Sequence, residues 1–271
     1  AGINYVIYQN SNDAIMGSAL FQVVGNDVLY DQDINMMTRA IAPGGGVVTG
    51  SPGSYGGQYD TVTYEDDGGL SQFGGPGNYQ NYHKGTTTVA GGSSNGLTWS
   101  RWSNGTAESD YPTNNEIVLG TNQAIHAVTG GLATSLPASG TAQYALAGAT
   151  APTIADGSVA PGTFTGTLGV AFGAYGDARV GVDFDVAIGG FTYNILTTGG
   201  SATAGFTNSH VPVAAAGGPA CTGMTCEATV TGFLTGQGAT GAALSYAISS
   251  NGSPNLSNTV HGVAAFTTAV P

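Results

Sequence analysis

From Leu97 to the end of the chain, apolar and polar residues alternate with a period of two, and clusters of Gly, Asn, Pro and Ser separate the alternating stretches. This period is typical of antiparallel strands with one buried face. The clearest stretch covers residues 163–172, whose apolar face consists of Phe164, Leu168, Val170 and Phe172. A second stretch, residues 180–188, ends at Gly189-Gly190. This pair predicts a hairpin turn, because primed turns need the positive φ that glycine adopts without strain.

Similar strands are predicted at Leu97 to Trp102, Ala124 to Thr129, Ala142 to Gly148, Phe191 to Ile195, Ala228 to Leu234, Ala242 to Ile248 and Val260 to Phe266. Together these segments make eight or nine strands. One-sided strands in this number close most economically into an antiparallel β-barrel, since closure removes the exposed edges that invite aggregation. A β-sandwich is the alternative.

Residues 1–96 have a different pattern. Strand-prone pieces near Ile3 to Tyr8, Leu20 to Val24 and Thr61 to Tyr64 precede a stretch rich in Gly and Tyr. We therefore expect a domain boundary near residues 91–96, which divides the chain into a loop-rich β region over 1–96 and a barrel over 97–271.

Composition favours an all-β fold. Helix-favouring segments are scarce, whereas Thr, Val, Tyr, Phe and Gly are the residues of strands and tight turns. Although the chain has 46 glycines, its 41% hydrophobic residues and 13 tyrosines offer enough apolar surface to offset chain entropy, so disorder is not expected. No apolar run approaches the roughly 20 residues that cross a bilayer, and we predict no membrane span.

Charge excludes one class of partner. Only 7% of residues are charged, and the formal net charge is -12. The four cationic residues stand singly, at Arg39, Lys84, Arg101 and Arg179. Proteins that bind nucleic acid need clustered cations to neutralise phosphates, so no nucleic-acid partner is expected.

The start of the chain and its two cysteines suggest export. Ala1 is not an initiator Met, and no basic segment precedes an apolar one, which leads us to expect an extracellular or outer cell-surface protein after signal-peptide removal. Cys221 and Cys226 lie in the short loop GGPACTGMTCEA, where a local disulfide is expected in an oxidising compartment. A zinc site is the alternative, but it needs four ligands and no second Cys pair accompanies this one.

Enzymatic chemistry has little support. Residues 92–96 can be read as G-x-S-x-G around Ser94, the nucleophile motif of hydrolases, but that motif needs a buried strand before it and a helix after it. The flanks TTTVAG and LTWSRW provide neither, so we place Ser94 in a linker and predict that the chain is not an enzyme.

Two acidic segments raise the question of calcium. Asp31-x-Asp33-x-Asn35 begins like a calcium loop, but Met36 stands where the loop needs glycine and Ala42 where it needs glutamate. Glu65-Asp66-Asp67-Gly68 is the better candidate, since a hard cation would relieve the repulsion of three adjacent carboxylates. A solvated acidic turn is the simpler interpretation, so no cofactor is expected and calcium stays an alternative.

The four histidines, His83, His126, His210 and His261, share no ligand spacing. By alternation His261 lies opposite Val260 and Phe266, so we expect it on the outer face of the barrel, where a histidine needs no special explanation.

The closing stretch of the chain reads ATVTGFLTGQGATGAALSYAISSNGSPNLSNTVHGVAAF, and earlier segments read LTWSRWSNG, IHAVTG, YALAGATAPT and GTFTGTLGVAFG followed by VGVDFDVAI. Over residues 97–271 this series resembles the small β-barrel of bacterial transferrin-binding-type surface lipoproteins, and related barrels end many exported FecR-type proteins. The resemblance implies a barrel and no particular activity, because proteins with this module capture host iron proteins, bind haem or do neither.

Scarce charge and abundant Gly, Thr, Ala and Tyr favour a structural role, as the subunit of an extracellular filament or matrix. Ile3, Tyr5 and Ile7 would share one face of a terminal strand that adds to an open sheet edge of a neighbouring subunit and so forms a polymer. Pairing of this strand inside its own chain remains open. The alternative function is a surface receptor or haemophore module that binds a host iron protein or a haem protein, and haem is expected only in that case.

Overall fold

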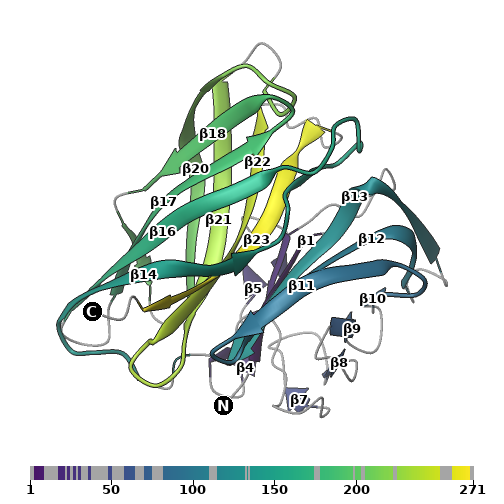
Figure 1. The fold of residues 1–271 in the computed structure, drawn as a ribbon. Coiled ribbons are helices and arrows are strands. Elements are labelled where there is room, and N and C mark those ends of the chain that lie inside the picture. Colours follow the sequence, from purple (N-terminus) through teal and green to yellow (C-terminus); the bar gives the residue numbers. More distant parts are fainter. Residues whose placement is uncertain are drawn as a thin grey trace.

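The computed structural model describes residues 82–109, 115–131, 133, 135–173, 178–197, 199–202, 205–221, 225–250 and 258–268, together with the backbone of the strands before residue 82. All the strands named in these parts belong to antiparallel sheets, and the described residues contain no α-helix. Two large sheets lie side by side in Figure 1, one closed and one open. The all-β prediction is therefore confirmed.

The open sheet has nine strands in the order β2-β1-β13-β12-β10-β9-β8-β7, with β11 paired to β12. Their bounds are β1 (Ile3–Tyr8), β2 (Ser18–Phe21), β7 (Val48–Gly50), β8 (Gln58–Tyr64), β9 (Leu70–Gly74), β10 (Tyr82–His83), β11 (Thr88–Ser94), β12 (Leu97–Ser109) and β13 (Asn115–Gly131). Two separate hairpins pair β3 (Val23–Val24) with β4 (Asp27–Val28) and β5 (Tyr30–Asp31) with β6 (Met36–Met37).

The second sheet closes into a barrel. Its ring consists of eight strands, namely β14 (Gly140–Ala149), β16 (Thr163–Phe172), β17 (Ala178–Ile188), β18 (Phe191–Leu196), β20 (Gly205–Ala216), β21 (Thr225–Thr235), β22 (Gly241–Ser250) and β23 (Val260–Thr268). Pairing of β14 with β23 closes the ring, and two short strands attach to it, β15 (Thr153–Ile154) on β23 and β19 (Gly200–Ala202) on β17. The antiparallel barrel predicted from the sequence is confirmed.

Alternation explains how the ring is filled. Successive residues of a strand point to opposite sides, so the apolar positions of β16 and β17 face the lumen and the polar ones face outward. Aromatic side chains occupy the lumen: the ring of Phe164 stacks 5.4 Å from that of Tyr246, and Phe184 lies 5.1 Å from Phe164 and 5.3 Å from Tyr246. Phe266 completes this group with an edge contact to Phe164.

Two hairpin turns illustrate how the sequence sets the register. Gly189 and Gly190 have φ values of 61° and 82° between β17 and β18, as the Gly-Gly pair predicted. Asn95 and Gly96 have φ values of 48° and 76° and form the corresponding turn between β11 and β12. Residues 91–94, expected in a linker, therefore belong to a strand. The predicted division after residue 96 falls in this turn, and the division into two domains stays a prediction.

Two segments expected in the barrel lie elsewhere. Leu97 to Trp102 belongs to β12 and Ala124 to Thr129 to β13, both in the open sheet. Alternation shows that one face of a strand is buried, but not which sheet buries it. Here the buried face packs on the outside of the barrel.

Candidate functional site

The open sheet is fastened to the barrel by a small apolar cluster. Leu97, Trp99 and Val128 come from the sheet, and the barrel contributes the outward side chains Phe233, Ala243, Val263 and Ala265. Two glycines make room for the indole of Trp99, because a β-carbon at Gly148 would lie 2.1 Å from its Cζ2 atom and one at Gly92 would lie 2.7 Å from it. Trp99 is therefore held between β11 of the sheet and β14 of the barrel.

Beside this cluster, two histidines meet across the interface. His126 lies on β13 and His261 on β23, both are 0% exposed, and their ring centroids are 5.1 Å apart in an edge-to-face arrangement. Threonines bridge them: His126 Nδ1 lies 2.8 Å from Thr150 Oγ1 and His126 Nε2 lies 2.8 Å from Thr153 Oγ1. Thr153 Oγ1 is also 3.3 Å from His261 Nε2. We call His126, Thr150, Thr153 and His261 the histidine cluster.

One set of proton positions satisfies the whole cluster. The backbone of Thr259 and Ala124 favours the protonated form of His261, which assigns the ring N–H to the nitrogen on that side. With its other nitrogen at Thr153, neutral His261 accepts a proton there from the hydroxyl. Thr153 Oγ1 then accepts from His126 Nε2, and His126 Nδ1 accepts from Thr150. Thr150 Oγ1 also accepts the Val263 N–H at 3.1 Å.

Burial keeps both rings neutral. Desolvation disfavours the charged form and lowers the pKa of His261 from 6.5 to about 3. The pKa of His126 is also well below its usual value, first because of burial and then because of the neighbouring charges that His261 and Arg101 would present. Both rings are therefore neutral near pH 7.

Arg101 is the cation nearest to this cluster in the strand register. It lies on β12 directly opposite His126 of β13, and its Nη2 donates a hydrogen bond of 2.9 Å to the Thr121 carbonyl. Partial burial lowers the pKa of Arg101. Its charge adds to the cost of placing a second positive charge on His126.

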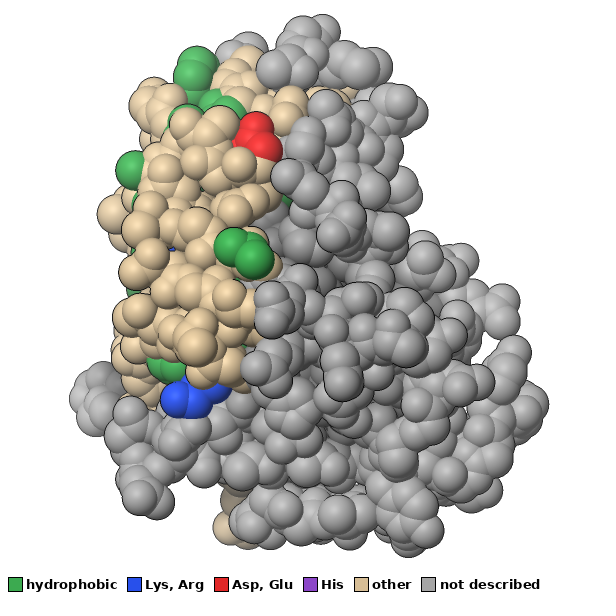
Figure 2. Space-filling model, turned by 90° about the vertical axis from the view of Figure 1, so that its right-hand side faces the viewer, with side chains coloured by type: hydrophobic (Ala, Val, Ile, Leu, Met, Phe, Trp, Pro, Cys, Tyr) green, Lys and Arg blue, Asp and Glu red, His purple; other side chains and the backbone are tan. Residues whose placement is uncertain are grey.

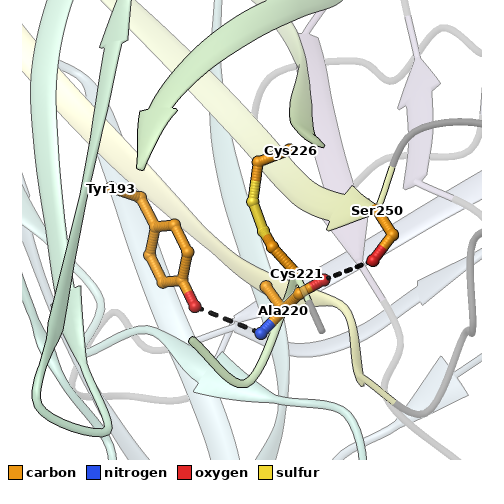
Figure 3. The surroundings of a disulfide bond; sticks show 5 residues. All are labelled: Tyr193, Ala220, Cys221, Cys226 and Ser250. Carbon is orange, nitrogen blue, oxygen red and sulfur yellow. Dashed lines mark hydrogen bonds between the residues drawn. A yellow bond between two sulfur atoms is a disulfide. The ribbon is translucent and has the colours of Figure 1, made fainter. Parts of the chain in front are cut away.

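Cys221 and Cys226 are joined in the disulfide expected from the sequence, with their Cα atoms 5.4 Å apart (Figure 3). The segment before Cys221 is fixed by hydrogen bonds to Ala220, whose N–H donates to the Tyr193 hydroxyl at 3.1 Å and whose carbonyl accepts from Ser250 Oγ at 3.1 Å. The disulfide therefore closes a loop against β18 and β22.

The prediction for His261 was half right. Its side chain points away from the lumen, as alternation indicated, but the outer face is covered there by β13, so His261 is buried and paired with His126. The sequence offered one signal for this pair, because each histidine lies within an apolar strand segment, IHAV or TVHGV. Neither segment showed that the two would meet.

Several other predicted residues can be located. Ser94 ends β11 and is followed by a turn and another strand, so the strand-to-helix context of a nucleophile motif is absent there. Ile3, Tyr5 and Ile7 lie on β1, which pairs with β13 along one edge and β2 along the other. Within the chain, β1 is thus an interior strand of the open sheet, next to the edge strand β2, and its role in assembly stays a prediction.

The acidic candidates lie mostly outside the described residues. This applies to Glu65-Asp66-Asp67-Gly68, and to Asp33 and Asn35 of the first segment. In the part of the chain that is described, no three His, Cys, Asp or Glu side chains gather into a group that could hold a metal ion. No helix of the described chain is long and apolar enough to cross a bilayer.

Comparison with known proteins gives a likeness of fold only. No family model and no curated protein matches the chain. Among solved structures, the chain is similar to the isotype 1 transferrin-binding protein B of serogroup B Neisseria meningitidis, with 11% identity and a TM-score of 0.42. Two mutants of transferrin-binding protein B from Haemophilus parasuis Hp5 give 10% and 9% identity and TM-scores of 0.42 and 0.41.

These comparisons cover 100% of this chain but only 44%, 45% and 46% of those chains. The chain therefore spans less than half the length of the structures it resembles. The FecR-type part of the sequence resemblance finds no support in them.

Proposed function

We propose that this chain is a non-enzymatic binding module of the bacterial cell surface, and that it binds a host iron-carrying protein of the transferrin class. The observation that carries the proposal is the filled barrel. Phe164, Phe184, Tyr246 and Phe266 pack against one another in the lumen, where a ligand-binding barrel would keep an open cavity. A partner is therefore bound on the outer surface, which suits a protein better than a small molecule.

The exposed surface is suited to a partner whose binding does not depend on charged side chains. Figure 2 shows a face on which charged side chains are sparse across the described part. Apolar side chains are exposed on the barrel strand β18, where Leu196 is 58% exposed and Phe191 43%. Exposed apolar side chains in a weakly charged surround are typical of contact sites for other proteins.

The test is binding of the full chain to immobilised iron-loaded transferrin and iron-free transferrin, by biolayer interferometry. We expect saturable binding with a Kd below about 10 µM, the affinity range of specific complexes. Leu196→Asp should weaken binding, whereas Tyr246→Phe, which changes only the lumen, should leave it unchanged. Absence of binding to either form at about 10 µM would overturn the proposal.

Haem and enzymatic activity are tested on the same sample. Because the lumen is filled, we propose that the barrel has no resident cofactor, and haem titration should produce no Soret shift. A fluorophosphonate probe should leave Ser94 unlabelled. Stoichiometric labelling of Ser94 would contradict the non-enzymatic part of the proposal.

Self-assembly is the other function expected from the sequence. We infer binding in preference to it, because addition of β1 to a neighbour would require this strand to leave β2 or β13. Negative-stain electron microscopy of the full chain beside a chain lacking residues 1–12 separates the two. Filaments that disappear on truncation would restore the polymer.

A further inference from the structure

The histidine cluster lies where two separately hydrogen-bonded sheets touch, and this position suggests more than a packing role. Its members come from both sides: His126 belongs to β13 of the open sheet, while His261 and Thr153 belong to β23 and β15 of the barrel. In the segment that follows β13, the Ala133 N–H donates to the Leu234 carbonyl of β21 at 2.8 Å. The cluster is thus a polar link between sheet and barrel, beside the hydrogen bonds that Asn122 and Gln123 of β13 donate to the Gly157 and Ala155 carbonyls.

We propose that His126 and His261 form a proton-sensitive latch, which holds the open sheet against the barrel while both rings are neutral and releases it when they take up protons. The latch is independent of the binding role proposed above.

The hydrogen-bond chain explains why a proton opens the latch. In the neutral cluster the hydrogen bonds run from Thr150 through His126 and Thr153 to His261, and the Thr150 hydroxyl also lies 3.4 Å from the Val263 carbonyl. A proton added to His126 Nδ1 or His261 Nε2 removes an acceptor nitrogen from this series, so the hydroxyl that donated to it must turn to another acceptor. It also places a positive charge in a site from which water is excluded, which is costly without a counter-ion.

Among the described residues that the rings contact or pair with, the charged and titratable groups are the following. From β12 comes Arg101, a cation opposite His126. Each histidine presents only another titratable ring to its partner. From β15 and the end of β14 come the neutral hydroxyls of Thr153 and Thr150, and from β22 the residue opposite His261 is Ala247. Tyr8 of β1 stands opposite His126 in the backbone register. The described elements thus bring no carboxylate to the rings.

The direction of the pH effect follows from linkage. When the sheet leaves the barrel, the rings reach water and the pKa of each returns toward 6.5, whereas in the closed interface the pKa is about 3 for His261 and well below 6.5 for His126. The open form therefore binds more protons between these values. Docking is strongest above pH 6.5 and weakens as the pH falls from there toward 3.

The size of the effect can be stated as a ratio. Between pH 6.5 and pH 5, the opening constant should rise about 16-fold for each histidine that gains a proton on opening, and about 250-fold for the pair. The carboxylates contribute little in this window, because their usual pKa values are near 4.

Hydrogen exchange of the full chain measures this opening constant at single amides. The Ala133 amide reports release of the segment that joins the end of β13 to the barrel, since its acceptor is the Leu234 carbonyl of β21. The Val186 amide on β17, which pairs with Tyr193 within the barrel, reports barrel unfolding. After correction for the intrinsic rate, we expect the Ala133 opening constant to rise about 250-fold from pH 6.5 to pH 5 and to exceed that of Val186.

Variants identify the groups responsible. His261→Gln should reduce the rise to about 16-fold, and His126→Gln/His261→Gln should abolish it, because glutamine keeps an amide near the hydroxyls and does not titrate. His83→Gln is the matched control and should leave the rise at its wild-type value, since the backbone of His83 pairs with that of Glu108, at the far end of β12 from the cluster.

Three results would overturn the latch. The first is that the Ala133 opening constant of the wild type rises less than about threefold from pH 6.5 to pH 5. This result does not depend on whether any variant folds. The second is an equal rise in the double variant. The third is an opening constant at Ala133 equal to that at Val186 at both pH values, because sheet and barrel would then open only by unfolding together.

Discussion

The hydroxyl group of Tyr246 is expected to destabilise the barrel whose lumen the ring of this residue fills. Its side chain is 1% exposed, and its hydroxyl has no hydrogen-bond partner among the described residues. The ring itself is well packed, between Phe164 and Phe184 and above Gly262, where a β-carbon would lie 2.5 Å from the hydroxyl oxygen. Burial alone raises the pKa of this phenol. Tyr246 thus combines favourable ring packing with an unpaired buried hydroxyl.

We predict that Tyr246→Phe stabilises the protein by about 1 kcal/mol. An unpaired buried hydroxyl costs about 1–3 kcal/mol, and the small void that its removal leaves offsets part of the gain. Urea unfolding of both proteins should show a higher midpoint with an unchanged slope, and thermal unfolding a rise of about 2–4 °C.

Two other buried tyrosines of the same barrel are matched controls, for which the same substitution should lower the unfolding free energy instead of raising it. The Tyr193 hydroxyl accepts the N–H of Ala220 and the Tyr144 hydroxyl donates to the Ala239 carbonyl. Phenylalanine at either position leaves a buried backbone group unpaired and should destabilise by about 1–3 kcal/mol. If Tyr246→Phe destabilised the protein as much as these two, the Tyr246 hydroxyl would have a partner and the reasoning would be refuted.

Further predictions follow from the disulfide, the interface and a turn. Replacing Cys221 and Cys226 by Ser should lower the unfolding free energy by about 2 kcal/mol, the chain entropy of so short a loop, measured by urea unfolding against the oxidised wild type. Intact mass should rise by about two daltons on reduction. Gly148→Val should shift the fluorescence emission of Trp99 to longer wavelength, measured in a Trp102→Phe background, because the new side chain displaces the indole from its buried site. An unchanged emission spectrum would contradict this. Gly96→Ala should cost about 1 kcal/mol through its φ of 76°. Gly120→Ala is the comparison, because Gly120 has no positive φ and a β-carbon there would come no closer than 3.5 Å to another residue.

The sequence predicted the strands of the barrel wherever the period of two was unbroken. It missed β20, and the reason lies in the strand itself. The pairing of β20 with β21 shifts register between Asn208 and Val211 and again between Pro212 and Ala216. Each irregularity changes which side chains face the lumen, so the alternation that identifies a strand is lost within it.

The histidine cluster could not be predicted for a different reason. Alternation correctly placed His261 outside the lumen, but its burial depends on β13, more than 100 residues earlier in the sequence and in another sheet. The alternation of apolar and polar residues along the chain contains no information on contacts between residues so far apart in the sequence. The disulfide was predictable because its two cysteines are only five residues apart.

Because the chain has few charged residues, the histidine cluster has a large share in the response of the protein to pH. In most proteins many titrating groups share the response to pH, and ion pairs compensate for one another. Here only 7% of residues are charged and four are histidines, so few groups change charge between pH 6.5 and pH 5. Two of the four histidines are buried together at the interface of sheet and barrel. Mild acid therefore acts mainly on the attachment of the sheet, while the described side chains that line the lumen of the barrel are apolar or phenolic and do not titrate in that range.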